Sequence, residues 1–465
     1  MRSKSRLRSA QAACIGVFLA CGVPGIGVRC SAQIKTNVVA GTASSDQTPT
    51  VESRKSEDQV SEIPLNSPPF PSSDWSYGGS PAIGTPDGDS CALLKQFGIP
   101  EGRHHIYGWL AMGVDASTSA KSTYPVSYSI YANRFELNQA VLNFERIPDT
   151  VQTKKFDWGY HVMALYGTDY RFTTSEGYFS QQLYQKNHQY GFDPMLAYVD
   201  LYLPVKKGMN IRIGRFMSMP GIESQPSLNN YNMTHSLAYT AAPSTETGAV
   251  ASIKLTKQWI VQLGITAGHD VAPWTDDAQA SALACLDYST SSHRDNLYLC
   301  ASGINGGEYG HDNVQHYDAT WYHRFNAKWH MASEVWYMYQ LDVPNVAGNV
   351  ANPVPTKIGA NGAYCANGQL TCTAPAYAFV NYLNRQVSPK LFVGFRSDIL
   401  NDKRGQRTGI PGKYTENTIY LTQYLTSALM LRPELRFDHS WDQRGYDNGT
   451  ARNQIFFGAD LIYRF

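Results

Sequence analysis

The chain has 465 residues and a formal net charge of +1, with 17% charged and 12% aromatic residues, including 30 Tyr. It is therefore poorer in charge and richer in aromatic side chains than an ordinary soluble protein. After residue 30, no apolar run approaches the roughly 20 residues that a membrane-spanning helix needs. Composition thus excludes a helical membrane protein, and the small net charge gives no reason to expect nucleic acid as a partner.

The first 32 residues predict a secretory signal peptide. A basic start precedes an apolar stretch at 12–23 and a small-x-small cleavage sequence, Cys30-Ser31-Ala32. Loss of residues 1–32 removes five basic and no acidic residues, so the net charge falls from +1 to −4. A lipid-attachment site at Cys21 or Cys30 is the alternative, but the residues before each of these cysteines match such a site poorly.

Residues 33–100 are rich in Ser, Thr, Pro and Gly, and Ser67-Pro68-Pro69-Phe70-Pro71 lies at their centre. Such a composition cannot bury enough apolar surface to offset chain entropy. We predict a flexible periplasmic linker, with at most a short helical turn near 91–97. The segment has neither the length nor the patterning of a folded plug domain.

From residue 104 onward, stretches with alternating apolar and polar residues recur. Fourteen of them predict strands near 104–115, 133–146, 157–168, 194–204, 209–217, 247–256, 258–268, 314–326, 329–340, 378–386, 389–398, 415–425, 427–438 and 452–465. Most are long enough for the about 9–11 residues that a tilted strand needs to cross a bilayer, whereas strands of soluble proteins average about 5–6.

The connections between these stretches are alternately short and long, which is the pattern of outer-membrane barrels. Short ones include 204–208 and 326–328, and long ones include 218–246 and 269–313. We therefore predict an all-β fold: a single antiparallel transmembrane β-barrel over residues 101–465, with about 14 strands and with 12 to 16 left open. Short turns would face the periplasm and long loops the outside.

The final stretch indicates which face of the sheet meets lipid. Its odd positions from Ile455 to Phe465 are apolar or aromatic, whereas Gln454 and Asp460 occupy even positions. A strand of a soluble sandwich is the alternative for this stretch alone. The aromatic carboxyl terminus also resembles that of bacterial outer-membrane barrels, whose final Phe is an assembly signal. This resemblance implies outer-membrane lipid and, through Phe465, the barrel-assembly machinery as partners.

The stretch 427–438 has the clearest facing, with leucines at odd positions and charges at even positions. A register shift of one residue would turn these charges toward lipid, at about 2–4 kcal/mol for a midplane Arg. We place Asp200 on the inward face by the same parity. The predicted pore-lining residues are Arg134, Glu136, Arg212, Lys254, Arg324, Glu334, Arg396, Arg432, Glu434, Arg436, Asp460 and Arg464. Because 133–146 breaks this parity midway, we predict a β-bulge near Gln139-Ala140.

Aromatic residues recur at one end of the predicted strands. Trp158, Trp259 and Trp329 each open a strand after a turn, and Phe325 and Phe465 close strands at the same level. These positions predict the periplasmic aromatic girdle of a membrane barrel, although soluble sheets are also rich in aromatic residues.

Cleavage of the signal peptide leaves five cysteines, and an exported chain meets oxidising conditions. Cys365 and Cys372 flank the turn residues Asn367-Gly368, and Cys285 and Cys300 lie within one segment that we predict to be an irregular loop. We predict these two disulfides and a free Cys91. Closely spaced pairs of Cys or His, as in a zinc site, are absent from the sequence.

Few residues suggest catalysis or metal binding. The best candidates for a barrel hydrolase are His235-Ser236 and Gly268-His269-Asp270, but no motif surrounds a nucleophile. Glu308, His311, Asp312 and His316 have loose spacing, which favours a solvated loop over a metal site. No phosphate-binding loop is present in the sequence. We predict a protein that is not an enzyme, without a metal or a cofactor.

The stretch Gly214-Arg215-Phe216-Met217-Ser218-Met219-Pro220-Gly221-Ile222-Glu223, together with Asn133-Arg134-Phe135 and Thr247-Gly248, resembles the OmpL-like β-barrel porin family. The resemblance runs from about His104 to Phe465 and rests on short motifs. It implies an outer-membrane barrel that acts as a channel, and it implies no particular substrate. The long linker and the loop cysteines are not expected of every member.

The segment 218–246 is polar and almost uncharged, and we predict that it folds inward as a constriction that includes Glu223 and Tyr231. A lumen of mixed charge favours small polar solutes. We therefore predict a passive porin for small hydrophilic solutes in a bacterial outer membrane. The alternative is a structural or adhesive barrel with a plugged lumen, and a barrel hydrolase is less favoured. The sequence leaves open whether copies form a homo-oligomer.

Overall fold

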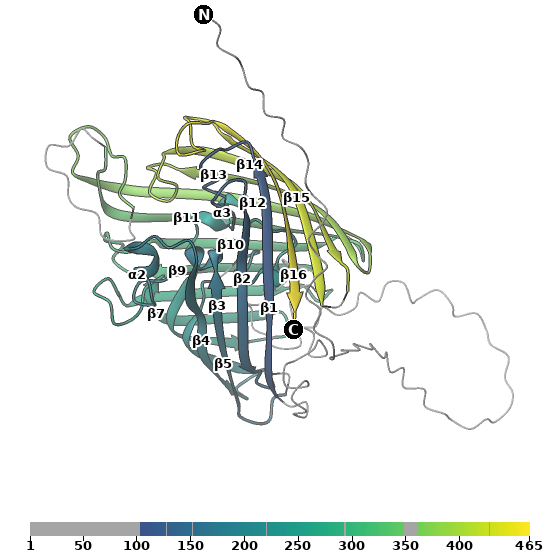
Figure 1. Cartoon of the computed structure of the whole chain (residues 1–465). Helices are drawn as coiled ribbons and strands as arrows, with labels where there is room; N and C mark the ends of the chain where they lie inside the picture. The colour runs from purple at the N-terminus through teal and green to yellow at the C-terminus, as the bar shows by residue number, and fades with distance from the viewer. Residues whose placement is uncertain are drawn as a thin grey trace, which may run out of the picture. The chain divides into compact units, whose positions relative to one another are not determined.

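The computed structural model describes residues 103–126, 128–150, 152–219, 221–292, 294–347, 361–426 and 428–465. Over these residues, sixteen strands form one closed antiparallel barrel in which each strand pairs with its neighbours in sequence. The first strand pairs with the last, so that β1 (His104–Ser117) lies beside β16 (Asn453–Arg464) in Figure 1. The predicted signal peptide, the linker and Cys91 lie outside the described residues.

The other strands are β2 (Phe135–Arg146), β3 (Asp157–Gly167), β4 (Gly191–Leu203), β5 (Met209–Met217), β6 (Thr245–Lys254), β7 (Trp259–His269), β8 (Ser281–Ser289), β9 (Asp295–Ile304), β10 (Gln315–Arg324), β11 (Trp329–Pro344), β12 (Thr371–Ser388), β13 (Leu391–Asp402), β14 (Gly412–Tyr424) and β15 (Leu429–Ser440). Short helices are η1 (Thr168–Phe172), α2 (Gln181–Tyr184), η2 (Ser227–Asn229) and α3 (Leu237–Ala241). In the described part of the chain, no helix is long and apolar enough to span a membrane.

The barrel has sixteen strands rather than about fourteen, because the segment 269–313 contains β8 and β9 instead of one long loop. In these two strands the inward positions include the apolar Leu283 and Tyr298, and both side chains are buried. Apolar residues on both faces weaken the alternation that reveals a strand in sequence. The predicted alternation of turns and loops is otherwise confirmed, and we call the two ends of the barrel the turn side and the loop side.

Both predicted disulfides are present. Cys285 and Cys300 are paired residues of β8 and β9, with their Cα atoms 4.1 Å apart, and both side chains are buried. This bond therefore lies in the barrel wall, and its predicted position in a loop was wrong. Cys365 and Cys372 join the loop before β12 to the start of that strand, on the loop side.

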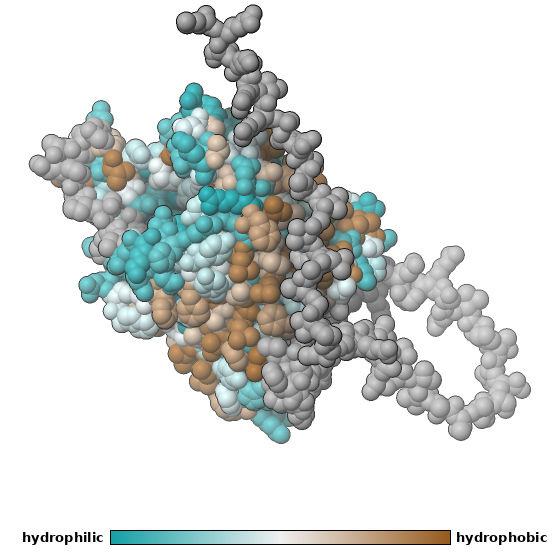
Figure 2. All heavy atoms as spheres, in the orientation of Figure 1, coloured by the Kyte–Doolittle hydropathy of each residue, from teal (hydrophilic) through white to brown (hydrophobic). Residues whose placement is uncertain are grey.

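The predicted facing of the last two strands is confirmed. On β15, Leu435 is 52% exposed, whereas Arg432 and Arg436 are at most 1% exposed. On β16, Phe457 is exposed and Asp460 is buried. Figure 2 shows hydrophobic residues gathered in a band over the middle of one face, with hydrophilic residues gathered on the loop side. An apolar outer band with charged side chains inside is the arrangement expected of a barrel that is surrounded by lipid.

The register of β1 against β2 shifts between Ala111 and Met112 and leaves Asn138 as an extra residue on β2. Asn138 and its neighbour Gln139 are both buried on the inner side. The predicted β-bulge is therefore confirmed, and it resets the inward parity of β2.

The predicted girdle residues lie at the turn side. Trp158, Trp259 and Trp329 lie at the starts of β3, β7 and β11, and Trp158 and Trp259 are 43% and 39% exposed. Further exposed aromatic residues lie at the loop ends of strands, for example Phe135 and Tyr166. Two aromatic levels are typical of the two interfaces of a membrane.

Two Leu→Arg variants test the outward facing. Leu435→Arg places a charge on the outer face in the middle of β15, and we expect it to lower the free energy of unfolding by about 2–4 kcal/mol. Leu425→Arg makes the same change in a turn, where the expected loss is about 0–1 kcal/mol. Urea titration of each barrel folded into lipid vesicles measures both. Equal losses for the two variants would contradict the assigned membrane band.

Candidate functional site in the barrel lumen

Residues 218–219 and 221–244, between β5 and β6, fold into the barrel, and we call them the inner segment. Its side chains are largely buried; Ser236 and Leu237 are 0% exposed. Its helix α3 lies against β12, β13 and β14. This polar segment thus lies inside the barrel, and its role as a constriction stays a prediction. Its residues contact partners that are remote in sequence on several strands of the wall.

Arg432 of β15 is the first of three arginines that hold the inner segment from the wall. Its Nη1 donates to the backbone oxygens of Ser227 at 2.7 Å and of Asn230 at 2.9 Å. Its Nε donates to a carboxylate oxygen of Asp460 at 2.9 Å. Because Asp460 pairs with the charge, the remaining donors are free to bind backbone oxygens that water does not reach.

Arg396 of β13 and Arg436 of β15 repeat this arrangement. Arg396 Nη1 donates to the backbone oxygen of Thr234, and Arg436 Nη1 donates to that of His235, both at 2.6 Å. Arg396 also pairs with Glu416 through its Nε at 2.9 Å. Arg396, Arg432 and Arg436 are all at most 1% exposed. These three arginines therefore face the lumen, as predicted. Their guanidinium groups bind backbone oxygens of the inner segment rather than solvent.

Wall carboxylates accept the N–H groups of the same segment. The pairs are Glu434 with Thr234 at 3.1 Å, Asp398 with Leu237 at 2.7 Å and Glu334 with Ile222 at 2.8 Å. Arginines thus bind the oxygens of the inner segment and carboxylates bind its N–H groups. Because β11, β13 and β15 all take part, the segment is fixed across the lumen rather than along one strand.

Glu223 and Tyr231, the predicted constriction residues, both lie on the inner segment and are buried. Glu223 accepts hydrogen bonds from Tyr382 Oη at 2.7 Å and from the backbone N–H of Ser236 at 2.9 Å. Burial raises the pKa of Glu223 above its ordinary value, against the lowering effect of Arg396. Tyr231 hydrogen-bonds His330 through its hydroxyl. Both residues therefore connect the inner segment to the wall.

The other predicted lining residues lie at different depths. Arg212 and Asp200 form a buried ion pair at 3.0 Å, and Glu136 is buried and accepts a hydrogen bond from Gln189 at 2.8 Å. Lys254, Arg324 and Arg464 are partly buried at the turn ends of their strands.

The role of Arg134 as a pore-lining residue stays a prediction. This residue precedes β2, is exposed, and its guanidinium lies 5.0 Å from the centre of the Tyr131 ring. The even-position rule for inward-facing residues was applied to Arg134, although β2 begins only at Phe135.

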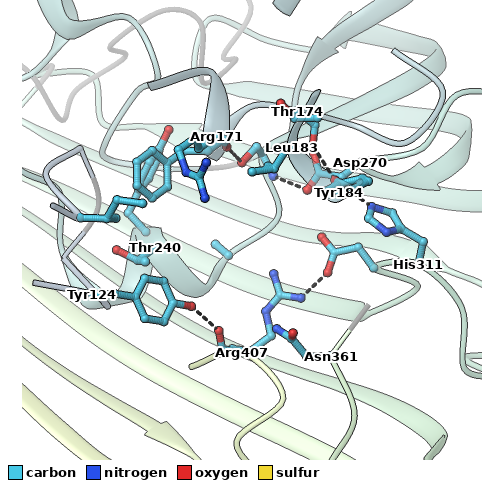
Figure 3. A pocket seen from close by; sticks show the side chains of 16 residues that line it. Tyr124, Arg171, Thr174, Leu183, Tyr184, Thr240, Asp270, His311, Asn361 and Arg407 are labelled. Atoms are coloured by element: carbon cyan, nitrogen blue, oxygen red, sulfur yellow. Dashed lines mark hydrogen bonds and ion pairs between the residues drawn. The ribbon is translucent and has the colours of Figure 1, made fainter. Parts of the chain in front are cut away.

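A cavity of about 290 Å³ opens on the loop side, and we call it the mouth cavity. It is lined by residues from several long loops, among them Tyr124, Arg171, Tyr184, Tyr239, Asp270, His311, Asp312, Asn361 and Arg407 (Figure 3). Arg407 pairs with Asp312 and donates from Nε to the backbone oxygen of Ala241 at 2.7 Å. Tyr124 Oη donates to the backbone oxygen of Arg407 at 2.8 Å. Hydrogen bonds between loops therefore shape this entrance.

Two neighbouring carboxyls in the mouth cavity have shifted pKa values of opposite sign. Burial, followed by the charge of Asp312, raises the pKa of Asp270 to about 7. For Asp312, burial acts to raise the pKa, but Arg407 and a hydrogen bond with Asp270 together hold it below its ordinary value. The pair therefore keeps one proton on Asp270 in weakly acidic solution, beside an ionised Asp312.

The residues considered for catalysis have other partners. His235 Nε2 lies 2.9 Å from the backbone oxygen of Ser224, and Ser236 Oγ donates to Glu223. His269 Nε2 lies 3.1 Å from Ser302 Oγ and 3.2 Å from Glu246 Oε1. Ser302 and Glu246 therefore both approach Nε2 of His269. In a catalytic triad the serine contacts one ring nitrogen of the histidine and the carboxylate contacts the other. Within the ranges that the structure describes, no group of three or more His, Cys, Asp or Glu is placed to hold a metal ion.

Some wall residues of this site were missed in the sequence. Asp398, Glu416 and Tyr382 bind the inner segment or its arginines. Asp398 and Glu416 lie at even positions of predicted strands, so that the parity rule, applied to every strand, would have found them. Tyr382 carried no such signal, because an apolar ring at an inward position reads as a lipid-facing residue.

The ion pair of Arg432 with Asp460 gives a stability prediction. Arg432→Met leaves the Asp460 carboxylate buried without its partner and removes two hydrogen bonds to the inner segment, and we expect a loss of about 3–5 kcal/mol in the free energy of unfolding. The double variant Arg432→Met/Asp460→Leu removes the stranded charge and should recover part of this loss. Urea unfolding followed by Trp fluorescence measures all three proteins. A double variant no more stable than Arg432→Met would contradict the assigned pairing.

The raised pKa of Asp270 gives a pH prediction. Its pKa is about 7 in the folded chain against an ordinary 3.8, so its stabilising contribution is full below pH 3.8 and is lost as the pH rises to about 7. Relative to Asp270→Asn, the wild type should lose at most about 1.4 kcal/mol of unfolding free energy per pH unit across this range. Above pH 7 the difference should be constant. Urea titrations of both proteins from pH 4 to pH 8 test this, and a difference independent of pH would contradict it.

Comparison with curated protein sequences gives no match. Solved structures with similarity include the outer membrane channel DcaP of Acinetobacter baumannii, at 11% identity over 78% of this chain and 97% of that chain with a TM-score of 0.47. The anion-selective porin from Comamonas acidovorans shares 10% identity over 78% and 99%, with a TM-score of 0.48. Salmonella typhi OmpF in complex with daunomycin shares 9% identity over 78% of this chain and 97% of that chain, with a TM-score of 0.46.

The sequence profile named "Putative beta-barrel porin-2, OmpL-like" matches residues 104–465. The chain therefore belongs to this family of OmpL-like β-barrel porins.

Proposed function

We propose that this porin acts in a bacterial outer membrane as a passive channel for small hydrophilic solutes, without an enzymatic step. Family membership and a closed barrel with an apolar band outside and charges inside support this proposal. In the proposed orientation, the long loops face the outside and the turns face the periplasm. Both ends of the barrel then lie on the periplasmic side, where an exported amino-terminal linker also belongs.

The observation that carries the proposal is the continuation of the mouth cavity into the lumen. A second cavity of about 20 Å³, which we call the deep cavity, shares Tyr239, Ala242 and Ser244 with the mouth cavity. It continues between the inner segment and the wall strands β10 and β11. A volume of this size holds about one water molecule. In this conformation the deep cavity has room for one water-sized species, and the proposed passage of larger solutes requires the inner segment to shift.

The hydrogen bonds between the inner segment and the wall favour a second candidate function. A barrel whose lumen is filled by such a segment would be a structural or adhesive protein, and its long loops would bind a surface partner. The two candidates differ in whether the folded barrel conducts ions.

Planar-bilayer recording of the purified full chain separates them. A passive channel should give discrete, reproducible current steps in the wild type, and the turn variant Leu425→Arg should give steps of the same size. Arg432→Met removes two hydrogen bonds that hold the inner segment and should enlarge or destabilise the open steps. Silence of a folded wild type, with steps only in Arg432→Met, would support the filled barrel instead. Swelling of vesicles in sugars of increasing size would then give the solute limit.

A further inference from the structure

The mouth cavity is much larger than the deep cavity to which it leads. Its volume of about 290 Å³ lies near the lower end of the about 300–1,000 Å³ that is usual for sites of small molecules, whereas the deep cavity holds about 20 Å³. The two cavities share Tyr239, Ala242 and Ser244. A small solute that enters from the loop side therefore has room in the mouth cavity and meets a narrower space beyond it.

Three tyrosine rings give the mouth cavity apolar faces that are held in place. Tyr124, Tyr184 and Tyr239 come from three different connections between strands, and Figure 3 shows Tyr124 and Tyr184 on different sides of the cavity. Tyr124 Oη donates to the backbone oxygen of Arg407 at 2.8 Å, and Tyr184 Oη donates to a backbone oxygen at 3.0 Å. The ring centres of Tyr239 and His235 are 4.3 Å apart. These contacts position the rings before a solute binds, so that an apolar face of the solute can pack on them.

Polar side chains line the same cavity. Arg407 uses Nε and Nη1 for its contacts with Ala241 and Asp312, so that the N–H groups of its Nη2 are available to an occupant. The carboxyl group of Asp270 accepts two backbone N–H groups, at 2.8 and 3.0 Å, which fixes its position. Asn361 adds an amide that has both a donor and an acceptor. The lining thus presents donors and acceptors of hydrogen bonds beside apolar ring faces.

The charged side chains of this lining compensate one another. Two arginines, Arg171 and Arg407, and two aspartates, Asp270 and Asp312, line the cavity. Arg407 and Asp312 form an ion pair, and Arg171 Nη2 donates to Asn187 Oδ1 at 2.6 Å. A solute with one net charge would meet a side chain of its own sign, and a zwitterion would have to separate the Arg407–Asp312 pair to use both of its charges. The lining therefore favours an uncharged polar solute.

Sugars combine the two features that this cavity offers to a solute. Each hydroxyl group both donates and accepts a hydrogen bond, and neighbouring hydroxyls can bind two N–H groups of a guanidinium or both oxygens of a carboxylate. The C–H groups of a sugar ring form an apolar face that packs on an aromatic ring. The small volume of the mouth cavity favours a single sugar ring over a chain of rings.

We propose that the mouth cavity is a binding site for one neutral sugar ring, such as a free hexose. The rings of Tyr184 and Tyr239 provide faces for its C–H groups, and Arg407, Asp270 and Asn361 bind its hydroxyl groups. The role of this site as an entry site, where the sugar is held before it passes the inner segment, rests on the proposed channel function. Binding itself does not require that the barrel conducts.

Isothermal titration calorimetry of the purified full chain in detergent micelles tests the site. The wild type should bind at least one of the hexoses glucose, galactose and mannose saturably, with one molecule per chain. The amino sugar and the uronic acid of that hexose, in which the same ring carries a positive or a negative charge, should bind at least about tenfold more weakly. An oligosaccharide of the hexose should bind no more tightly than the free sugar. Tighter binding of the oligosaccharide would assign the cavity to a surface glycan and overturn its role as an entry site.

Two variants of the lining should lose this affinity. Arg407→Gln removes the guanidinium and should weaken hexose binding at least about tenfold, the usual effect of losing a hydrogen bond from a charged group. Leu183→Trp on α2 fills part of the cavity without removing a side-chain hydrogen bond, and it should give a similar loss if Arg407→Gln does not fold. The matched control is Arg404→Gln, which makes the same charge change in the same loop outside the cavity lining and should keep the wild-type affinity. Heat-modifiable migration on a gel verifies the folding of each protein.

Absence of saturable binding of all three hexoses to the folded wild type, or wild-type affinity in both folded lining variants, would overturn the sugar site. Planar-bilayer recording tests the channel separately, and the hexose that binds should reduce the ion current in a saturable manner. A current that bound hexose leaves unchanged would overturn the entry role. A silent wild type that binds hexose would overturn the channel function and leave the site standing, whereas an open channel without hexose binding would overturn the site alone.

Discussion

The pairing of β1 with β16 is the constraint on which the rest of the barrel depends. In hydrocarbon no water satisfies a free strand edge, so a sheet can cross a membrane only when its first and last strands pair. The register from Trp109 opposite Arg464 to Ser117 opposite Phe456 provides this closure. Closure also gives every strand one face toward lipid and one toward the lumen. The charges of β15 and β16 therefore have only the interior to occupy.

The inward-facing charged side chains need hydrogen-bond partners inside the barrel. Many of these partners are backbone groups of the inner segment. Arg432 is paired by Asp460 on the neighbouring strand, and its remaining donors reach carbonyl oxygens of the inner segment. A polar, nearly uncharged segment suits this role because it offers N–H and C=O groups without adding charges of its own. The wall thereby fixes the path of the inner segment largely through its backbone.

Strand parity predicted the facing of Arg432 and Leu435 because a period of two depends only on local sequence. It failed where both faces are apolar, as in β8 and β9. The partners of the inward charges could not be predicted. Ser227 and Arg432 meet only because the barrel closes and the inner segment turns inward, and no local pattern encodes a contact over about 200 residues.

The two sides of the inner segment differ in a way that bears on passage through the lumen. Toward β13 and β15, arginines and carboxylates bind its backbone directly, and movement there would strand buried charges, each at several kcal/mol. Toward β11, Glu334 accepts the N–H of Ile222 and Tyr231 hydrogen-bonds His330, beside a small cavity with unpaired polar atoms. Displacement on this second side breaks fewer interactions. Any widening of the lumen in this region therefore starts next to the deep cavity, where the inner segment has fewer partners in the wall.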